Sequence, residues 1–366
     1  MQGEITLVRF LLLVGLSGCA SIGPGTVARD RFDYITAISD SWKSQTLLNL
    51  VKIRYGDAPV FLDVASVINS YGLETQVSLA ASWAHFLFSK GSTSVFGGPT
   101  DAQSLGATTR YTDKPTITYT PLSGEKFARN LMTPTQPVHI LNLIQAGYPI
   151  DLVLRALVHS INSVHTRFGG SARGRLADPE FYPLAAKMRK IQLSGEIGMR
   201  VERVGDRTAT LMIFGQNPTA ETAADIAEVR QILRLDPKAR ELSVVYGSVA
   251  SNDKEIALLT RTMLEILVDL GSYIQVPLAN LEEGRTYPTP PAETANGAAV
   301  VPLIQILSSA EPPKDAFAAV PYRNVWYWID DKDFRSKSFF SFVMFLFTLT
   351  ETGDKQGAPV ITLPAG

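Results

Sequence analysis

The strongest concentration of chemically versatile side chains lies near the C-terminus. Three aromatic residues are followed by three aspartates: Trp326, Tyr327, Trp328, Asp330, Asp331 and Asp333. Aromatic rings beside carboxylates could form a platform for a sugar, and closely spaced carboxylate oxygens are ligands for calcium. The competing interpretation is structural, with alternating aromatic residues on both faces of a buried strand and Asp330 or Asp331 capping the next helix. We favour the structural interpretation and keep the two tryptophans and the three aspartates as candidate binding residues.

The remaining polar residues show no familiar catalytic or metal-binding spacing. The four histidines are scattered: His85, His139, His159 and His165. No paired His/Cys pattern, nucleophile elbow, phosphate loop or dinucleotide fingerprint occurs, and Gly169-Gly170 is interpreted as a loop. Arg173 and Arg175 beside Asp178 are interpreted as solvated surface. We expect neither a metal nor another cofactor and lean against an enzyme, although a catalytic triad is defined by geometry that sequence hides.

Cys19 is the only cysteine of the chain, and it follows an apolar segment at the N-terminus. Arg9 precedes the apolar residues 10–16, and the small residues Ser17 and Gly18 come directly before Cys19. This order is typical of an export signal, and the apolar run is too short to cross about 30 Å of hydrocarbon. Leu16-Ser17-Gly18-Cys19 resembles the lipobox of bacterial lipoproteins, in which the cysteine sulfur receives a diacylglyceryl group and the chain is cleaved before it.

The lipobox resemblance implies where in the cell the mature protein is located. It predicts a lipoprotein signal peptide over residues 1–18, cleavage between Gly18 and Cys19, and a lipidated tether over residues 19–28. Acyl chains such as palmitate on Cys19 would hold the mature chain in a membrane. Ala20 stands where lipoproteins retained in the inner membrane typically carry aspartate, so the resemblance implies the outer membrane with the folded part facing the periplasm. Glu4 is unusual before such a segment and leaves the start codon open.

Composition fits a folded protein. The chain has 366 residues, 45% of them hydrophobic and 19% charged, which is enough apolar material for a sizeable core. The formal net charge of -1 argues against nucleic acid as a partner, because phosphates require a broad positive field. With a single cysteine, no disulfide can form within the chain, so the core alone must stabilise the fold.

Residues 29–195 are predicted to form a helix-rich region. Apolar periodicity and start signals predict helices over 29–55, from 123–125, over 138–146, over 150–161 and from 178 to 191. The apolar segment 60–82 suits a strand pair, with a helix over 64–71 as the alternative. Alternation over 115–120 predicts a strand. Residues 89–113 are rich in Gly, Ser and Thr, which predicts a long loop.

Residues 196–366 are predicted to form a strand-rich region. A hairpin is expected at 197–213, helices at 219–235, 256–271 and 339–349, and strands at 242–246, 300–307, 320–329 and 359–363. The proline-containing stretch 282–298 is expected to run over the surface. Together these elements predict an α+β fold in which a mixed or antiparallel sheet packs with several amphipathic helices, with a domain or subdomain change near residue 196.

Three stretches together resemble an uncharacterised family of lipoproteins of Gram-negative bacteria. They are Arg31–Tyr34 with Leu48–Tyr55, then Pro115–Gly124, then Trp326–Asp331. No activity, cofactor or mapped site comes with this family, so the resemblance implies only the cellular location.

Two functional hypotheses follow from these observations. The leading hypothesis is a lipid-anchored protein that binds or scaffolds within the cell envelope, with an unidentified envelope protein as partner. The alternative is an envelope hydrolase with an unrecognised active site, for which the segment 89–113 would be the natural lid. A deep polar pocket near that segment would favour the hydrolase, and a flat exposed apolar patch would favour the binding protein.

Overall fold

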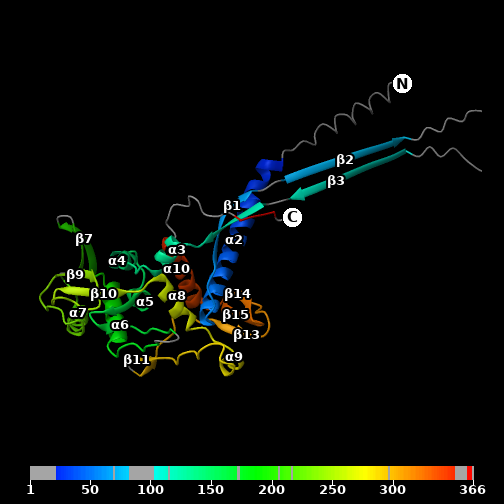
Figure 1. Cartoon of the computed structure of the whole chain (residues 1–366). Coiled ribbons are helices and arrows are strands. Elements are labelled where there is room, and N and C mark those ends of the chain that lie inside the picture. The colour runs from blue at the N-terminus through cyan, green and yellow to red at the C-terminus, as the bar shows by residue number, and fades with distance from the viewer. Residues whose placement is uncertain are drawn as a thin grey trace, which may run out of the picture. The chain divides into compact units, whose positions relative to one another are not determined.

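The computed structural model describes residues 22–68, 71–81, 103–113, 116–170, 174–204, 207–215, 217–295, 297–350 and 361–364. The chain divides into two compact units. The first unit contains the described parts of Met1–Thr36, Leu62–Pro121 and Gly357–Gly366, and the second contains those of Ala37–Phe61 and Leu122–Gln356. Figure 1 labels the helices and strands of both units.

The long helix expected near the N-terminus is confirmed as α2 (Ile22–Arg54). It begins earlier than the predicted residue 29, and Leu47, Leu50 and Val51 on its later turns are fully buried. Gly56, with φ of +77°, follows the helix in the left-handed conformation that only glycine adopts at no steric cost.

The strands of the first unit form two separate sheets. One has the order β1-β4-β16, formed by β1 (Phe61–Ile68), β4 (Thr116–Leu122) and β16 (Ile361–Pro364). The other is an antiparallel ribbon of β2 (Tyr71–Ala81) with β3 (Gln103–Asp113). The strands predicted at 115–120 and 359–363 are confirmed, and β16 pairs with β4 in antiparallel register.

Two expectations for this unit require correction. The segment 60–82 does contain two strands, but they do not pair with each other, since β1 joins β4 and β2 joins β3. The predicted loop 89–113 is wrong over residues 103–113, which pair with β2 along the whole strand. Threonine is β-branched and favours strands, so its abundance there was a poor signal for a loop. Residues 89–102 lie outside the described part of the chain.

The largest sheet belongs to the second unit and has the order β6-β5-β10-β9-β8-β7. Its strands are β5 (Val158–Ile161), β6 (Val164–His165), β7 (Ile197–Val204), β8 (Arg207–Phe214), β9 (Glu241–Tyr246) and β10 (Glu255–Thr260). Only the β9 and β10 pair is parallel, and β7 with β8 is the predicted hairpin. The change expected near residue 196 falls within this sheet, which takes strands from both sides of that position.

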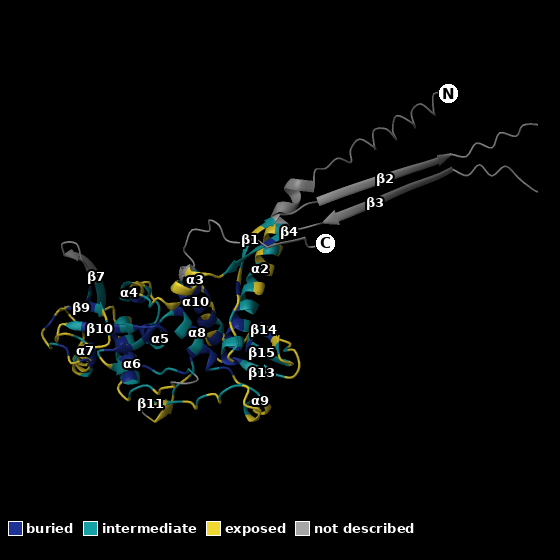
Figure 2. Cartoon of the chain, in the orientation of Figure 1, coloured by how far each residue is buried: buried dark blue, intermediate teal, exposed yellow. Residues whose placement is uncertain are grey.

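Helices pack with this sheet and with one another. They are α3 (Glu125–Met132), α4 (Pro137–Gln145), α5 (Ile150–Leu157), α6 (Phe181–Leu193), α7 (Ala220–Ile232), α8 (Met263–Gly271), α9 (Leu278–Glu282) and α10 (Phe334–Thr350). Buried residues, dark blue in Figure 2, concentrate in elements such as α5 and α10. Within the described residues, no helix combines the length and the apolar character needed to cross a bilayer.

Two predicted helices are shorter than expected because each contains a strand. The helix over 150–161 ends at Leu157, and the next residues form β5. The helix over 256–271 begins only at Met263, after the strand β10. Both strands are buried on nearly all sides, and such a continuous apolar run cannot be distinguished from a buried helix by periodicity. Thr262 and Glu265 form a capping box that marks the true helix start.

The C-terminal part of the second unit forms a small sheet with the order β13-β15-β14. Its strands are β13 (Leu307–Ser309), β14 (Ala316–Tyr322) and β15 (Val325–Asp330). The strand predicted over 300–307 is confirmed only at its end, where Ile306 forms an isolated bridge with Ile274 and Leu307 begins β13. The stretch 282–298 lies mostly at the surface in its described residues, as predicted. It is irregular apart from the end of α9 and the two-residue strands β11 (Thr294–Ala295) and β12 (Ala298–Ala299). The predicted α+β class is confirmed.

The helix α10 offers a matched pair of phenylalanines for a stability test. Phe340 is 0% exposed and Phe345 is 47% exposed. Phe340→Ala is expected to lower the free energy of unfolding by about 3–5 kcal/mol, because the cavity left in the core adds to the lost burial. Phe345→Ala is expected to cost less than half as much. Equal losses in urea denaturation would contradict the assignment of α10 as a core helix.

Candidate functional site

The aromatic and acidic residues singled out near the C-terminus occupy β15 and the start of α10. Tyr327 is fully buried and its hydroxyl hydrogen-bonds to that of Tyr55, while Trp326 and Trp328 alternate with it and remain partly exposed. All three residues pair with both neighbouring strands of the small sheet. The aromatic rings are therefore distributed over both faces of a central strand, as the structural interpretation expects.

The three aspartates are engaged locally. Asp333 accepts hydrogen bonds from the backbone N–H and the hydroxyl of Ser336 at the start of α10. Asp330 accepts from the backbone N–H of Lys332, and Asp331 pairs with the Lys337 ammonium at 2.6 Å. The helix cap is Asp333, where Asp330 or Asp331 was expected. Among the described residues, no group of three or more His, Cys, Asp or Glu is placed to hold a metal ion.

The remaining candidate residues singled out in the sequence are either outside the described part of the chain or at the surface. Cys19, Gly18 and Arg173 lie outside the described residues. Arg175 pairs with Asp178 at 2.6 Å, and both side chains keep contact with solvent, as expected for a surface cluster. Burial of Asp178 works against its charge, but hydrogen bonds from His165 and Arg175 lower the pKa of this carboxyl below its ordinary value.

A buried charge network that sequence reasoning missed lies around Asp269 on α8. The Asp269 side chain is only 3% exposed. Its Oδ2 accepts from Arg261 Nη1 at 2.9 Å, and its Oδ1 accepts from Arg167 Nη1 at 3.1 Å. The backbone N–H of Gly169 donates to the same Oδ1 at 2.6 Å. One carboxylate therefore holds two guanidinium groups and one backbone amide.

Arg261 connects this carboxylate to the chain that follows β5. The residue is fully buried, and its Nη2 donates to Thr166 Oγ1 at 2.8 Å and to the backbone carbonyl of Arg167. Its guanidinium also lies 5.4 Å from the ring centre of Phe168. Removing one partner of a buried ion pair is costly because the other charge is left in a medium of low dielectric constant. The network thus fixes residues 166–169 against α8.

Gly169 has a steric requirement that its interpretation as a loop residue did not predict. A Cβ atom built at this position would lie 1.9 Å from the hydroxyl oxygen of Ser272 and 2.6 Å from the Ser272 Cβ. Only glycine lets the backbone approach α8 closely enough for its N–H to reach Asp269.

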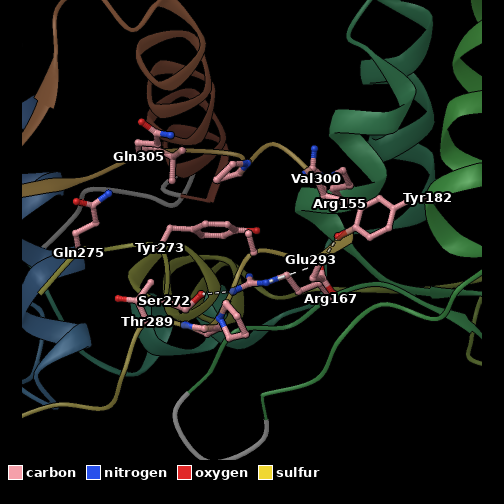
Figure 3. Close-up of a pocket in the computed structure, with 15 residues that line it drawn as sticks. Arg155, Arg167, Tyr182, Ser272, Tyr273, Gln275, Thr289, Glu293, Val300 and Gln305 are labelled. Carbon is pink, nitrogen blue, oxygen red and sulfur yellow. Dashed lines mark hydrogen bonds and ion pairs between the residues drawn. The ribbon is translucent and has the colours of Figure 1, made fainter. Parts of the chain in front are cut away.

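A pocket of about 150 Å³ lies on the other side of Arg167 (Figure 3). Arg155 of α5, Tyr182 of α6 and Tyr273, which follows α8, contribute to its wall, together with residues from the segments 289–293 and 300–305. All of these residues belong to the second unit. The pocket therefore collects side chains from segments far apart in the sequence.

Glu293 closes one side of this pocket from the proline-containing segment. Its side chain is 8% exposed, although this stretch was expected to lie on the surface. One carboxylate oxygen accepts from the backbone N–H of Ala177 at 2.8 Å, and the other accepts from the Tyr182 hydroxyl. Burial and this bond raise the pKa of Tyr182 above its ordinary value, so the hydroxyl remains protonated and donates. Glu293 has both oxygens engaged.

Arg54 of α2 holds the other end of the same segment. This buried guanidinium donates to the Tyr287 carbonyl at 2.8 Å and to Thr289 Oγ1 at 3.1 Å, and it lies 3.8 Å from the ring centre of Tyr287. Thr289 donates in turn to the carbonyl of Ile274 at 2.7 Å. The segment between Tyr287 and Glu293 is therefore attached at both ends, which fixes that wall of the pocket.

Two polar groups at the pocket remain available. Arg155 donates from Nη2 to the Val301 carbonyl at 2.8 Å and lies 5.8 Å from the Tyr182 ring centre, but no described carboxylate lies within ion-pair distance of it. The Tyr273 hydroxyl has no hydrogen-bond partner among the described residues. Burial raises the pKa of Tyr273, which keeps this hydroxyl a donor.

The geometry offers little to a hydrolytic reaction. Ser272 Oγ donates to the backbone carbonyl of Asp269 at 2.6 Å and accepts from Arg167, so its hydroxyl proton is not directed at a base. No described histidine lines the pocket. A nucleophile needs an adjacent base or a lowered pKa, and neither is found at the described wall.

Comparison of the chain with protein-family models, with curated proteins and with solved structures finds no match. The resemblance to an uncharacterised lipoprotein family therefore stays a prediction from the sequence.

Loss of the central carboxylate is expected to destabilise the second unit strongly. Asp269→Asn leaves the Arg261 guanidinium buried without a negative partner, which should lower the free energy of unfolding by about 3–5 kcal/mol. Glu125→Gln removes one partner of a solvent-exposed pair with Arg129 and should change it by less than about 0.5 kcal/mol. Urea denaturation of the two variants checks this, and a mild effect of Asp269→Asn would contradict the central role of Asp269.

The two glycines Gly169 and Gly198 differ in the space around them. Gly169→Ala should lower the free energy of unfolding by about 1–3 kcal/mol, because the new methyl group overlaps Ser272. A Cβ at Gly198 of β7 would meet only the Ile213 carbonyl at 3.9 Å, so Gly198→Ala should be neutral or slightly stabilising. Thermal denaturation distinguishes the two, and a Gly169→Ala variant as stable as the wild type would refute the close approach.

Proposed function

We propose that this chain is a lipid-anchored protein of the Gram-negative outer membrane whose folded part faces the periplasm and acts by binding. The observation that carries the binding part is the pocket beside Arg167. Its fixed wall holds two groups with unused donors: Arg155, which forms no ion pair with a described carboxylate and donates to the Val301 carbonyl from Nη2, and the hydroxyl of Tyr273. A pocket held in shape before its ligand arrives reduces the entropy lost on binding.

The proposed anchor rests on the sequence around Cys19. The only thiol of the chain follows an apolar export segment and two small residues, in the order that the lipobox resemblance requires. Each CH₂ group buried in lipid contributes about 0.8 kcal/mol, so one acyl chain binds reversibly while several give stable anchoring. A lipidated cysteine would therefore keep the folded units at the membrane surface.

The hydrolase hypothesis receives less support from the geometry. Its lid was expected at 89–113, but residues 103–113 form β3, which pairs with β2 along the whole strand. In the pocket wall, the Tyr182 hydroxyl donates to Glu293, and the Ser272 and Thr289 hydroxyls donate to backbone carbonyls. We therefore prefer a role in binding or scaffolding in the envelope. The partner of the anchored chain would be an unidentified envelope protein.

Membrane fractionation and intact-mass measurement test the proposed lipid anchor and membrane location. The wild-type chain should begin at Cys19, carry acyl mass and sediment with the outer membrane, whereas Cys19→Ser should keep residues 1–18 and lack acyl mass. Ala20→Asp is the matched control, since it should keep the acyl chains and move the protein to the inner membrane. A soluble wild-type chain with an unmodified cysteine and an intact N-terminus would refute the anchor.

A further inference from the structure

We propose that the pocket beside Arg167 binds a small organic monocarboxylate, with the carboxylate held by Arg155 and the hydroxyl of Tyr273. The inference rests on the proposed binding function and names the chemical class of its ligand.

Among the described charged residues that line the pocket, Arg155, Arg167 and Glu293, one cation has no counter-ion. Arg261 and Arg167 share the carboxylate of Asp269, and Glu293 lies 4.0 Å from Arg167 Nε. These two arginines are thus matched by two carboxylates. Arg155 lines the same pocket and has no such partner among the described residues, so a bound group with one negative charge would complete the set.

A second positive charge, that of Arg335, lies near Arg155. Burial lowers the pKa of Arg335, and repulsion from the Arg155 guanidinium lowers it further. The two arginines therefore lie close enough to repel each other, while the carboxylates of Asp151 and Asp333 act on Arg335 in the opposite direction. Arg335 is exposed on α10 and does not line the pocket, so Arg155 is the group that a bound ligand would meet.

The free donors suit an oxyanion. Arg155 uses Nη2 for the Val301 carbonyl, which leaves its other N–H groups for a ligand. Figure 3 shows the Tyr273 ring in the pocket, between Gln275 and Gln305 on one side of the view and Glu293 on the other. A guanidinium and a phenol can both donate to a carboxylate, and hydrogen bonds to a charged group are about twice as strong as neutral ones.

The pocket walls indicate that the ligand has an apolar organic part attached to its carboxylate. Pro290, Pro291, Val300, Pro302 and Ile304 supply apolar surface. The volume of about 150 Å³ is close to that of an engineered protein cavity that holds benzene, so a ligand of roughly six to nine non-hydrogen atoms fits. One uncompensated cation and an apolar wall favour a monocarboxylate over a phosphate, whose second charge would have no partner in the described pocket wall.

The experiment titrates the full-length purified protein with pairs of probes that differ in charge alone. Acetate, propionate, lactate and benzoate are compared with their neutral amides by ligand-observed NMR, and inorganic phosphate and methyl phosphate are titrated in parallel. We expect the larger carboxylates to bind at least about tenfold more tightly than the matching amides, since one charged pair is lost. Added salt should weaken this preference.

Three variants assign the binding to the proposed residues. Arg155→Gln should weaken carboxylate binding by at least about tenfold and leave amide binding unchanged. Tyr273→Phe, which removes only the hydroxyl, should weaken it by about threefold to tenfold. Arg335→Gln is the control near Arg155 but outside the pocket, and it should change the affinity by less than about threefold. Thermal denaturation verifies that each variant is folded.

The outcomes separate this inference from the proposed function. Equal binding of acids and amides, preference for either phosphate, carboxylate binding that survives Arg155→Gln, or no binding by any probe would each overturn the monocarboxylate site. The proposed function would survive the first three outcomes, because the pocket would still bind a ligand. It fails separately if the wild-type chain is neither acylated nor membrane-bound in the fractionation experiment.

Discussion

The second unit depends on the carboxylate of Asp269, which lies between the two guanidinium groups of Arg261 and Arg167. Without it the two cations would repel each other, and Arg261, which is fully buried, would have no counter-charge and no water to solvate it. The same carboxylate accepts the N–H of Gly169, so it fixes both the charges and the backbone that carries one of them. The close approach then requires glycine at position 169, because any Cβ would overlap Ser272. A single aspartate on α8 thereby determines the path of the chain after β5.

The pocket is a consequence of this network. With Arg167 held by Asp269, one face of its guanidinium lies 4.3 Å from the ring centre of Tyr273. The segment that ends at Glu293 closes the pocket because it is attached to Arg54 at one end and to Tyr182 at the other. Of the two described arginines that line the pocket, Arg167 has carboxylate partners and Arg155 has none. Because Arg155 has no ion-pair partner among the described residues, the pocket beside the network is a candidate binding site.

Much of the fold could be predicted from the sequence, whereas the site could not. The long helix α2, the hairpin of β7 and β8 and the apolar helix α10 follow from local periodicity and turn residues. Periodicity failed at Ile256–Thr260, because a strand buried on both faces has the same continuous apolar pattern as a buried helix. The site joins residues such as Arg167 and Asp269, about a hundred positions apart, and no local signal connects them. Glu293 was hidden for a different reason, since proline-containing segments usually lie on the surface. The capping box at Thr262 was a readable signal for the true start of α8.

The most direct test of this account is a double-mutant cycle on the buried pair, with Arg261→Met, Asp269→Leu and the double variant compared in urea denaturation. Arg261→Met leaves Asp269 with Arg167 as its remaining cationic partner, and Asp269→Leu leaves Arg261 buried without a carboxylate. The double change removes both members of the pair. We predict that the double variant loses at least about 2 kcal/mol less of the free energy of unfolding than the sum of the two single losses. Losses that add to within about 0.5 kcal/mol would show that the two residues act independently, and would contradict the central place given to Asp269.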